Sequence, residues 1–208
     1  MKESEICSIL TPYGVSISGQ DAFKIQTYME LLSLWGKKIA LTAIRQEDDI
    51  LRFHFGESIF ALTICGIGHG RLADVGSGAG FPGLPIKILR SELSVTLIEP
   101  NKKKCAFLHE VVRALELRDV DILSAGFEAS TIGPGELSYI TTRALGRLPK
   151  LLNWARAELE SDGRVMLWLG VDDYARISTI PDWEWSDPVL IPGTSNRMIL
   201  SGRRKGRS

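Results

Sequence analysis

A glycine-rich stretch holds the residues of this chain whose types and spacing could bind a ligand. In order, they are Leu72, Ala73, Asp74, Val75, Gly76, Ser77, Gly78, Ala79, Gly80, Phe81, Pro82 and Gly83. Glycine lets the backbone take a positive φ and lets a ligand approach the main chain closely. Pro82 and Pro85 suit the first turn of a helix, where a missing N–H costs little. We therefore predict a buried strand, a glycine turn, and a helix whose free N–H groups face a ligand crevice.

Two classes of nucleotide site fit the spacing of these glycines. Gly78, Gly80 and Gly83 match G-x-G-x-x-G, the pattern of dinucleotide-binding sites. The same run, with Asp74 and Gly76 ahead of it, matches the D-x-G-x-G-x-G pattern of S-adenosylmethionine (SAM) methyltransferases. A tight turn without a ligand is the third interpretation. The glycines alone do not choose among the three, so the choice depends on the rest of the chain.

Charged residues follow two further predicted strands. Residues 94–99 form the second strand, and Glu99 stands at its carboxyl end, about 20 residues beyond the glycine turn. A carboxylate at this position can accept hydrogen bonds from both ribose hydroxyls of an adenosine. Residues 137–142 form the fourth strand, which ends at Arg143. Because ligands bind outside the carboxyl ends of such strands, we expect Glu99 and Arg143 at one crevice.

The spacing of the histidines does not indicate a metal site. His54, His69 and His109 are far apart and have no partner cysteine or carboxylate at ligand spacing, so we predict no metal. We expect His54 to be a hydrogen-bonded packing residue rather than a catalytic base.

The elements that must position these residues alternate along the chain. Ser18 and Asp21 resemble a capping box at the start of a helix that ends near Gly36, with Ile25 and Tyr28 on one face. A second helix, at residues 46–65, should have three residues near one face, namely Ile50, Phe53 and Ala61. Helices are predicted at residues 18–36, 46–65, 101–117 and 149–159, and strands at 94–99, 120–123, 137–142 and 164–169, with an antiparallel closing pair at 183–185 and 197–201.

Composition limits the partners and the compartment. The 208 residues suit one α/β domain with a small extension. Lysine plus arginine equals aspartate plus glutamate, at 25 each, so a nucleic-acid partner would have to be met by a local patch. The three cysteines are scattered, which suits a reducing cytoplasm. Charges at Lys2, Glu3 and Glu5 argue against a signal peptide, and no apolar run is long enough to span a bilayer.

Strand, glycine turn, acidic strand end and closing antiparallel pair together describe the SAM methyltransferase version of the doubly wound α/β sheet. The chain also resembles the bacterial RsmG family, called GidB as well, whose members methylate N7 of a guanine in small-subunit ribosomal RNA. The segments that carry the resemblance are Trp35 with Leu41-Thr42, His54 with Glu57-Ser58, the stretch from Asp74 to Gly83, Lys103 with Phe107-Leu108, and Arg143-Ala144.

The resemblance implies a SAM-dependent rRNA (guanine-N7)-methyltransferase with a Rossmann-like fold. Its expected substrate is 16S rRNA within the small ribosomal subunit or an assembly intermediate. The family places SAM contacts at Gly76, Phe81, Phe127, Glu128 and Arg143. With the glycines and the acidic strand end, the expected cofactor-binding residues are Gly76, Gly78, Gly80, Phe81, Glu99, Phe127, Glu128 and Arg143, and Arg143 is also the expected catalytic residue.

The expected organisation has three parts. Residues 1–66 form an N-terminal helical extension packed on the core, residues 67–202 form the SAM-binding methyltransferase domain, and residues 203–208 form a basic, frayed tail. Phosphate contacts are expected from the tail, Arg147, Lys150 and the lysines at 102–104, although a solvated charge run is the alternative for those lysines. We expect a cytoplasmic monomer that binds no membrane.

The sequence departs from the family at three positions. The family usually has Asn where Ala40 stands and Arg where Phe53 stands, and many members have Lys where Leu169 precedes Gly170. An RNA contact is therefore not carried over to Ala40 or Phe53, and Leu169 removes one basic group near the crevice. None of the three touches the glycine stretch.

Guanine N7 already carries a free lone pair, so its methylation needs no strong general base. Arg143 is accordingly expected to hold substrate or cofactor rather than to stabilise the positive charge that the guanine gains.

Three other functions fit the glycine turn. They are an NAD(P)-linked oxidoreductase, for which no Tyr-x-x-x-Lys pair is evident, a SAM-sensing protein without enzyme activity, and a methyltransferase of a small molecule.

Overall fold

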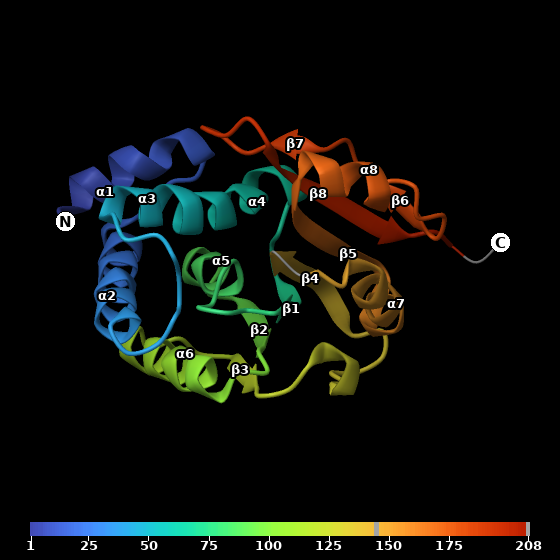
Figure 1. Cartoon of the computed structure of the whole chain (residues 1–208), viewed down its shortest axis with the longest axis horizontal. Helices are drawn as coiled ribbons and strands as arrows, with labels where there is room; N and C mark the ends of the chain where they lie inside the picture. Colours follow the sequence, from blue (N-terminus) through green and yellow to red (C-terminus); the bar gives the residue numbers. More distant parts are fainter. Residues whose placement is uncertain (144–145, 207–208) are drawn as a thin grey trace.

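The computed structural model describes residues 1–143 and 146–206 of the chain, which form one mixed β-sheet with helices on both faces (Figure 1). Within this part of the chain the sheet has eight strands in the order β3-β2-β1-β4-β5-β8-β6, and β7 pairs with β8. The strands are β1 (Gly70–Val75), β2 (Leu93–Ile98), β3 (Val120–Leu123), β4 (Leu137–Arg143), β5 (Leu159–Gly170), β6 (Trp183–Trp185), β7 (Val189–Leu190) and β8 (Arg197–Arg204).

The strand order makes this a doubly wound sheet, as predicted. β1 pairs in parallel with both β2 and β4, so the winding direction reverses between β1 and β4. Ligands of open α/β sheets bind outside the carboxyl ends of the strands at this reversal. β8 is antiparallel to β5, β6 and β7, which confirms the antiparallel closing pair.

The helices divide between the N-terminal region and the two faces of the sheet (Figure 1). The N-terminal helices are α1 (Glu3–Leu10), η1 (Thr11–Tyr13), α2 (Gly19–Gly36), α3 (Glu47–Ile50), η2 (Leu51–Gly56) and α4 (Glu57–Cys65). The later helices are α5 (Gly83–Leu89), α6 (Lys102–Ala114), η3 (Phe127–Ala129), α7 (Leu148–Glu158) and α8 (Val171–Ile177).

Two hydrophobic clusters hold these layers together. One contains Ile25 and Tyr28 of α2 together with Leu72 of β1 and Leu97 of β2, so the N-terminal helices share a core with the sheet. The other lies under α7 and α8 on the opposite face and includes Leu151. Parallel strands covered on both faces are apolar along most of their length, and β1 becomes fully buried toward its carboxyl end.

The start of α2 confirms the predicted capping box. Ser18 Oγ accepts a hydrogen bond from the Asp21 backbone N–H at 3.1 Å, and Asp21 Oδ2 accepts one from the Ser18 N–H at 3.0 Å. Such reciprocal bonds satisfy N–H groups that the first helical turn leaves unpaired. The helix ends at Gly36, as expected.

The segment predicted as one helix at 46–65 contains a π-helical turn, η2, between α3 and α4. A π-helical turn holds more residues than an α-helical one, so it rotates the side chains after it. Of the three residues expected near one face, Ile50 and Ala61 are buried, whereas Phe53, within the π-helical turn, is half-buried.

Three other boundaries differ from the prediction. β5 begins at Leu159, five residues before the predicted start at residue 164. α6 ends at Ala114 rather than near residue 117, and Glu116 adopts a left-handed φ of 51°. β8 continues through Arg204, because Arg203 pairs with Arg164 of β5 and Glu184 of β6. The expectation of a frayed tail is thus wrong for residues 203–204, while 207–208 lie outside the described residues.

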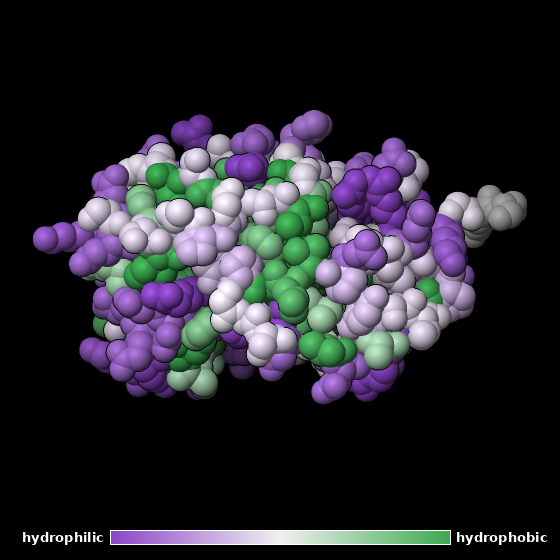
Figure 2. Space-filling view, turned by 90° about the horizontal axis from the view of Figure 1, so that it is seen from above, coloured by the Kyte–Doolittle hydropathy of each residue, from purple (hydrophilic) through white to green (hydrophobic). Residues whose placement is uncertain are grey.

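Viewed from above, the molecule shows a band of hydrophobic residues between two more hydrophilic sides (Figure 2). Among the helices in the described part of the chain, none combines the length and the apolar character that crossing a membrane requires.

Candidate active site

The glycine turn follows β1 at the reversal of the winding direction. Gly76, Gly78 and Gly80 have φ values of 72°, 59° and 91°, a region that side chains disfavour. A Cβ added at Gly78 would meet only the Gly76 carbonyl oxygen, at 3.8 Å. The outer side of the turn at Gly78 is therefore open, and a ligand can approach the main chain there.

The other glycines of the turn are required by packing. A Cβ at Gly80 would collide with the hydroxyl of Tyr28, and one at Gly83 would lie 2.8 Å from Asp74 Cβ. Tyr28 also donates a hydrogen bond from its hydroxyl to the Ala79 carbonyl oxygen. Helix α2 therefore fixes the shape of the glycine turn from the side opposite the crevice.

Asp74 fixes the base of the turn. It is fully buried in β1, and Oδ1 accepts a hydrogen bond from Thr141 Oγ1 at 2.8 Å while Oδ2 accepts one from the Gly83 N–H at 3.2 Å. Burial raises the pKa of this carboxyl to about 6, and the bonds from Thr141 and Gly83 oppose that rise. Asp74 joins β1, β4 and the start of α5.

Glu99 lies at the carboxyl end of β2 and contacts the glycine turn directly. Its Oε2 accepts a hydrogen bond from the Gly78 N–H at 2.9 Å, and its Oε1 accepts one from the Asn101 N–H at 2.8 Å. Glu99 is 5% exposed. Each oxygen retains a second lone pair. An open glycine turn beside a carboxylate with spare acceptor capacity fits the ribose and amino-acid parts of SAM.

Phe81 faces away from the crevice. Its ring is buried and stacks on Tyr28 at 5.3 Å and on His54 at 4.7 Å between centroids. A cofactor contact from Phe81 would therefore come from its main chain, while the side chain supports the turn.

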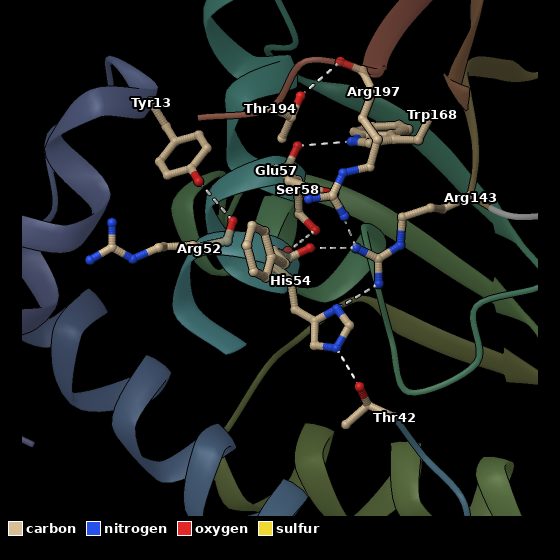
Figure 3. A network of polar contacts seen from close by, with 11 residues as sticks. Tyr13, Thr42, Arg52, His54, Glu57, Ser58, Arg143, Trp168, Thr194 and Arg197 are labelled. Atoms are coloured by element: carbon tan, nitrogen blue, oxygen red, sulfur yellow. Dashed lines mark hydrogen bonds and ion pairs between the residues drawn. The ribbon is translucent and has the colours of Figure 1, made fainter. Parts of the chain in front are cut away.

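Arg143 extends from the end of β4 to the π-helical turn η2 (Figure 3). Nη1 donates to the Phe53 carbonyl at 2.9 Å, and Nη2 donates to His54 Nδ1 at 2.9 Å. The guanidinium carbon also lies 5.5 Å from the centroid of the Phe81 ring. Arg143 thus touches both the glycine turn and the N-terminal helices.

His54 is held in one tautomer. Arginine can only donate, so Nδ1 of His54 accepts and Nε2 carries the proton, which it donates to Thr42 Oγ1 at 2.6 Å. Burial and the charges of Arg143 and Arg197 lower the pKa of this imidazole to about 3. His54 is hydrogen-bonded, as predicted, and remains neutral at physiological pH.

Glu57 brings a second arginine to the site. This carboxylate is 2% exposed, and its Oε2 lies 3.9 Å from Arg143 Nη1. Arg197 Nη2, from the start of β8, lies 2.8 Å from Glu57 Oε1 without forming a hydrogen bond. Burial raises the pKa of Glu57, and the two arginines oppose that rise. Two guanidinium groups therefore converge on one buried carboxylate.

Phe127 and Glu128 form a second group after β3. Phe127 is buried against Trp154 of α7, whereas Glu128 is exposed and lies 2.7 Å from Arg147 Nη1. The Arg147 guanidinium also covers the Phe127 ring at 5.8 Å. The structure thereby joins the segment after β3 to the segment after β4 at the carboxyl edge.

A pocket of about 400 Å³ opens beside Arg143, between η2 and the ends of β5 and β8. Its lining includes Phe53 and Leu169, two of the positions at which the sequence departs from the family. Ala40, the third, is exposed after α2. A larger pocket of about 600 Å³ lies beneath α7 and α8 and shares Trp168, Leu169 and Asp173 with the first.

Sequence reasoning did not assign roles to Tyr28, Thr42, Glu57 or Arg197. Glu57 carried a local signal, because it is the charged residue that begins an otherwise apolar helix, and charged residues are rarely buried without partners. Arg197 carried none, since its contact with Glu57 depends on β8 lying beside β5. In residues 1–143 and 146–206, no group of three or more His, Cys, Asp or Glu side chains could hold a metal ion.

Comparisons with known proteins show which family and which fold this chain is similar to. The family model GidB, rRNA small subunit methyltransferase G, matches residues 21–181. Ribosomal RNA small subunit methyltransferase G of Roseiflexus sp. (strain RS-1) is 34% identical over 201 residues, covering 90% of this chain and 85% of the relative. The protein of the same name from Chromobacterium violaceum is 35% identical over 172 residues, covering 81% of both chains.

Among solved structures, a SAM-dependent methyltransferase from Aquifex aeolicus aligns with a TM-score of 0.63 and 13% identity, over 76% of this chain and 93% of that one. The ribosomal protein L11 methylase from Lactobacillus delbrueckii subsp. bulgaricus gives the same TM-score at 16% identity, over 74% and 79% of the two chains. At these identities the likeness concerns the fold.

Proposed function

The chain belongs to the GidB family, rRNA small subunit methyltransferase G, and from this membership we propose that it methylates N7 of a guanine in 16S rRNA. It is a SAM-dependent methyltransferase with a Rossmann-like fold. The observation that supports the proposal is the open glycine turn at Gly78, hydrogen-bonded to Glu99 at the point where the winding of the sheet reverses. The family membership replaces the dinucleotide interpretation of the same glycines.

We assign the cofactor contacts to the carboxyl edge of the sheet. The main chain at Gly76 and Gly78 faces the methionine part of SAM, and Glu99 accepts hydrogen bonds from the ribose. Phe127 and Glu128 lie beside the adenine. Gly80 and Phe81 complete the turn, and their packing against Tyr28 keeps it in shape.

The reaction makes modest demands on the protein side chains. When bound, SAM would supply a methyl group to N7 of the neutral guanine, whose lone pair needs no deprotonation, and the carbon–sulfur bond of SAM would break as the carbon–nitrogen bond forms. His54 fits this chemistry because its ring nitrogens are both engaged, one by Arg143 and one by Thr42. The chain contributes mainly by positioning, which is worth on the order of 7–11 kcal/mol in favourable intramolecular cases.

Arg143 is the residue we assign to holding substrate and cofactor together. Its guanidinium is fixed by the Phe53 carbonyl and by His54, so it does not need to be ordered when the substrate arrives. A cation would oppose the positive charge that the guanine gains, so the role of Arg143 is positioning rather than charge stabilisation.

The proposed substrate is the small ribosomal subunit or an assembly intermediate. A guanine within folded RNA must be exposed before N7 can meet the methyl group. Lys102 and Lys103 are exposed at the start of α6, and Arg147 and Lys150 are exposed near the start of α7, where they could contact phosphate. We further propose that the protein acts as a monomer in the cytoplasm.

The test incubates the purified protein with labelled SAM and small subunits that lack the modification, followed by digestion of the RNA and detection of 7-methylguanosine. Arg143→Ala should lower turnover about 100-fold, because a small misplacement of the reacting atoms has an effect of this size. Arg71→Ala is the control, since Arg71 is also paired with a glutamate but lies in β1, away from its carboxyl end.

The outcomes separate the parts of the proposal. Full activity of Arg143→Ala would remove Arg143 from the site. SAM binding without 7-methylguanosine would contradict the substrate and leave the fold and cofactor unchanged.

A further inference from the structure

Of the residues assigned to cofactor contacts, Arg143 lines the pocket of about 400 Å³ beside η2, and the others do not. This pocket lies between η2 and the ends of β5 and β8, and its polar lining comes from His54, Glu57, Arg143, Asp173 and Arg197. Its volume falls within the range of small-ligand sites. Arg143 ends β4, which pairs with β1, so the pocket opens at the same carboxyl edge of the sheet as the glycine turn.

A flat cationic surface forms one part of the pocket. The Arg197 guanidinium carbon lies 4.8 Å from the centroid of the Phe53 ring, so the aromatic ring supports the guanidinium. Guanidinium planes and aromatic rings are the two side-chain surfaces on which unpaired nucleic-acid bases stack. Both are present here, and they come from segments far apart in the sequence.

The guanidinium of Arg197 keeps its hydrogen-bonding capacity. It approaches Glu57 as an ion pair, and the Oε1 atom 2.8 Å from Arg197 Nη2 has no hydrogen-bond partner among the described residues. The side chain of Arg197 is 40% exposed. An arginine carries five N–H donors, and phosphate oxygens match their geometry. Arg197 can therefore bind a phosphate without breaking a hydrogen bond within the protein.

The charges of the pocket favour one anion. Arg143 and Arg197 carry two positive charges against the single charge of Glu57, and His54 is neutral. Asp173, the other charged group of the lining, is paired with Arg176 of α8. The cluster thus has an excess of one positive charge, which matches the single negative charge of a phosphodiester.

We propose that this pocket receives the target guanine nucleotide, with the base on the Arg197–Phe53 surface and its phosphate bound by Arg197. The inference rests on the proposed function, because it assumes that an rRNA guanine is the substrate. Glu57 acts as a positioning residue that holds Arg143 and Arg197 at one distance from each other.

The test measures methyl transfer to unmodified small subunits for Arg197→Ala and Phe53→Ala, with SAM affinity followed by calorimetry. Each variant should lose roughly 10- to 100-fold in kcat/KM for the subunit, the range found when a base-stacking side chain is removed. SAM affinity should stay within about twofold, because neither residue belongs to the cofactor contacts. Phe53→Tyr keeps the ring and should retain activity.

Arg71→Ala provides the matched control. The Arg71 side chain is 42% exposed and paired with Glu136, whereas that of Arg197 is 40% exposed and paired with Glu57. It lies in β1 away from the carboxyl edge and should leave kcat/KM unchanged. If Arg197→Ala fails to fold because Glu57 loses a partner, Arg197→Lys keeps the charge while losing the flat surface, and it should still lose activity.

Wild-type kcat/KM in both Arg197→Ala and Phe53→Ala would overturn the proposal. A parallel loss of SAM affinity would overturn it as well, since the pocket would then hold the cofactor. If the wild-type protein forms no 7-methylguanosine, the proposed function fails, and guanosine 5′-monophosphate titrated into the protein becomes the probe. Arg197→Ala must then weaken its binding about tenfold, and equal binding would refute the pocket assignment.

Discussion

At the scale of single residues, the site depends on how its charged groups are paired. His54 sits between Arg143 and Thr42, and this arrangement works only with a neutral imidazole, because a protonated Nδ1 could not accept from the guanidinium. Removing the imidazole would free Arg143 on one side. The same pairing that orients Arg143 therefore makes the folded state sensitive to acid.

The pH dependence of stability follows from the lowered pKa of His54. The folded-state pKa is about 3 and the ordinary value is 6.5, so between these values the unfolded chain binds the extra proton. The contribution of His54 is fully present above pH 6.5 and is lost as the pH falls. Relative to His54→Gln, the wild-type protein should lose about 2 kcal/mol of unfolding free energy between pH 7 and pH 5.

Urea unfolding at the two pH values measures this difference. The contribution of Asp74 to the pH dependence cancels, because both proteins contain this residue. His109→Gln is the control, since His109 is exposed on α6 and takes no part in the contacts of Arg143. A pH-independent difference for His54→Gln would show that the imidazole is not held neutral.

At the scale of elements, the glycine turn is shaped between α2 and β1. Tyr28 of α2 occupies the space beside Gly80, and Asp74 of β1 occupies the space beside Gly83. Gly78 alone among these three has open space around it. The glycines of one pattern thus have different physical roles, two in packing and one in admitting a ligand.

Alanine substitutions should separate these roles. Gly78→Ala carries the left-handed strain of about 1–2 kcal/mol and should also weaken SAM binding, because its Cβ points into open space at the crevice. Gly80→Ala carries the same strain and should lose a further 1–3 kcal/mol or so through its collision with Tyr28. Urea unfolding and calorimetric titration of SAM provide the two measurements.

Gly66→Ala isolates the strain. Gly66 follows α4 with a φ of 60° and has no atom within 4 Å of an added Cβ. It should lose stability like Gly78→Ala and keep full SAM affinity. Equal stability losses for Gly66→Ala and Gly80→Ala would contradict the packing role of Tyr28.

At the scale of the whole molecule, charge is balanced rather than basic. The 25 basic residues are matched by 25 acidic ones, so the average field does not attract RNA. The two arginines at the pocket and the exposed lysines at the start of α6 are local exceptions. Recognition should therefore depend on fitting a shaped surface more than on general attraction.

A comparison of substrates tests this expectation. The protein should methylate the unmodified small subunit far faster than a short naked hairpin with the same guanine, and its binding to naked RNA should be weak at physiological salt. Methyl transfer to the two substrates at equal concentration is the measurement. Equal rates would show that the local RNA sequence is sufficient for recognition.

The sequence by itself determined the local elements and the cofactor class. The periodicity of residues 18–36, the capping box at Ser18 and the glycine turn depend on neighbours within a few positions, so they could be predicted and the structure confirms them. The position of Glu99 at the carboxyl end of the second strand was also predicted, and the structure adds its hydrogen bond from the Gly78 N–H. The roles of individual site residues remain predictions.

Only the tertiary structure decided how the site is braced. The bond from Tyr28 to the glycine turn joins residues 51 apart, and the contact of Arg143 with His54 joins residues 89 apart. The π-helical turn that directs Phe53 to the pocket, and the placement of Arg197 over its ring, left no local pattern. Such contacts arise from the packing of distant segments, which the spacing of residues along the chain does not encode.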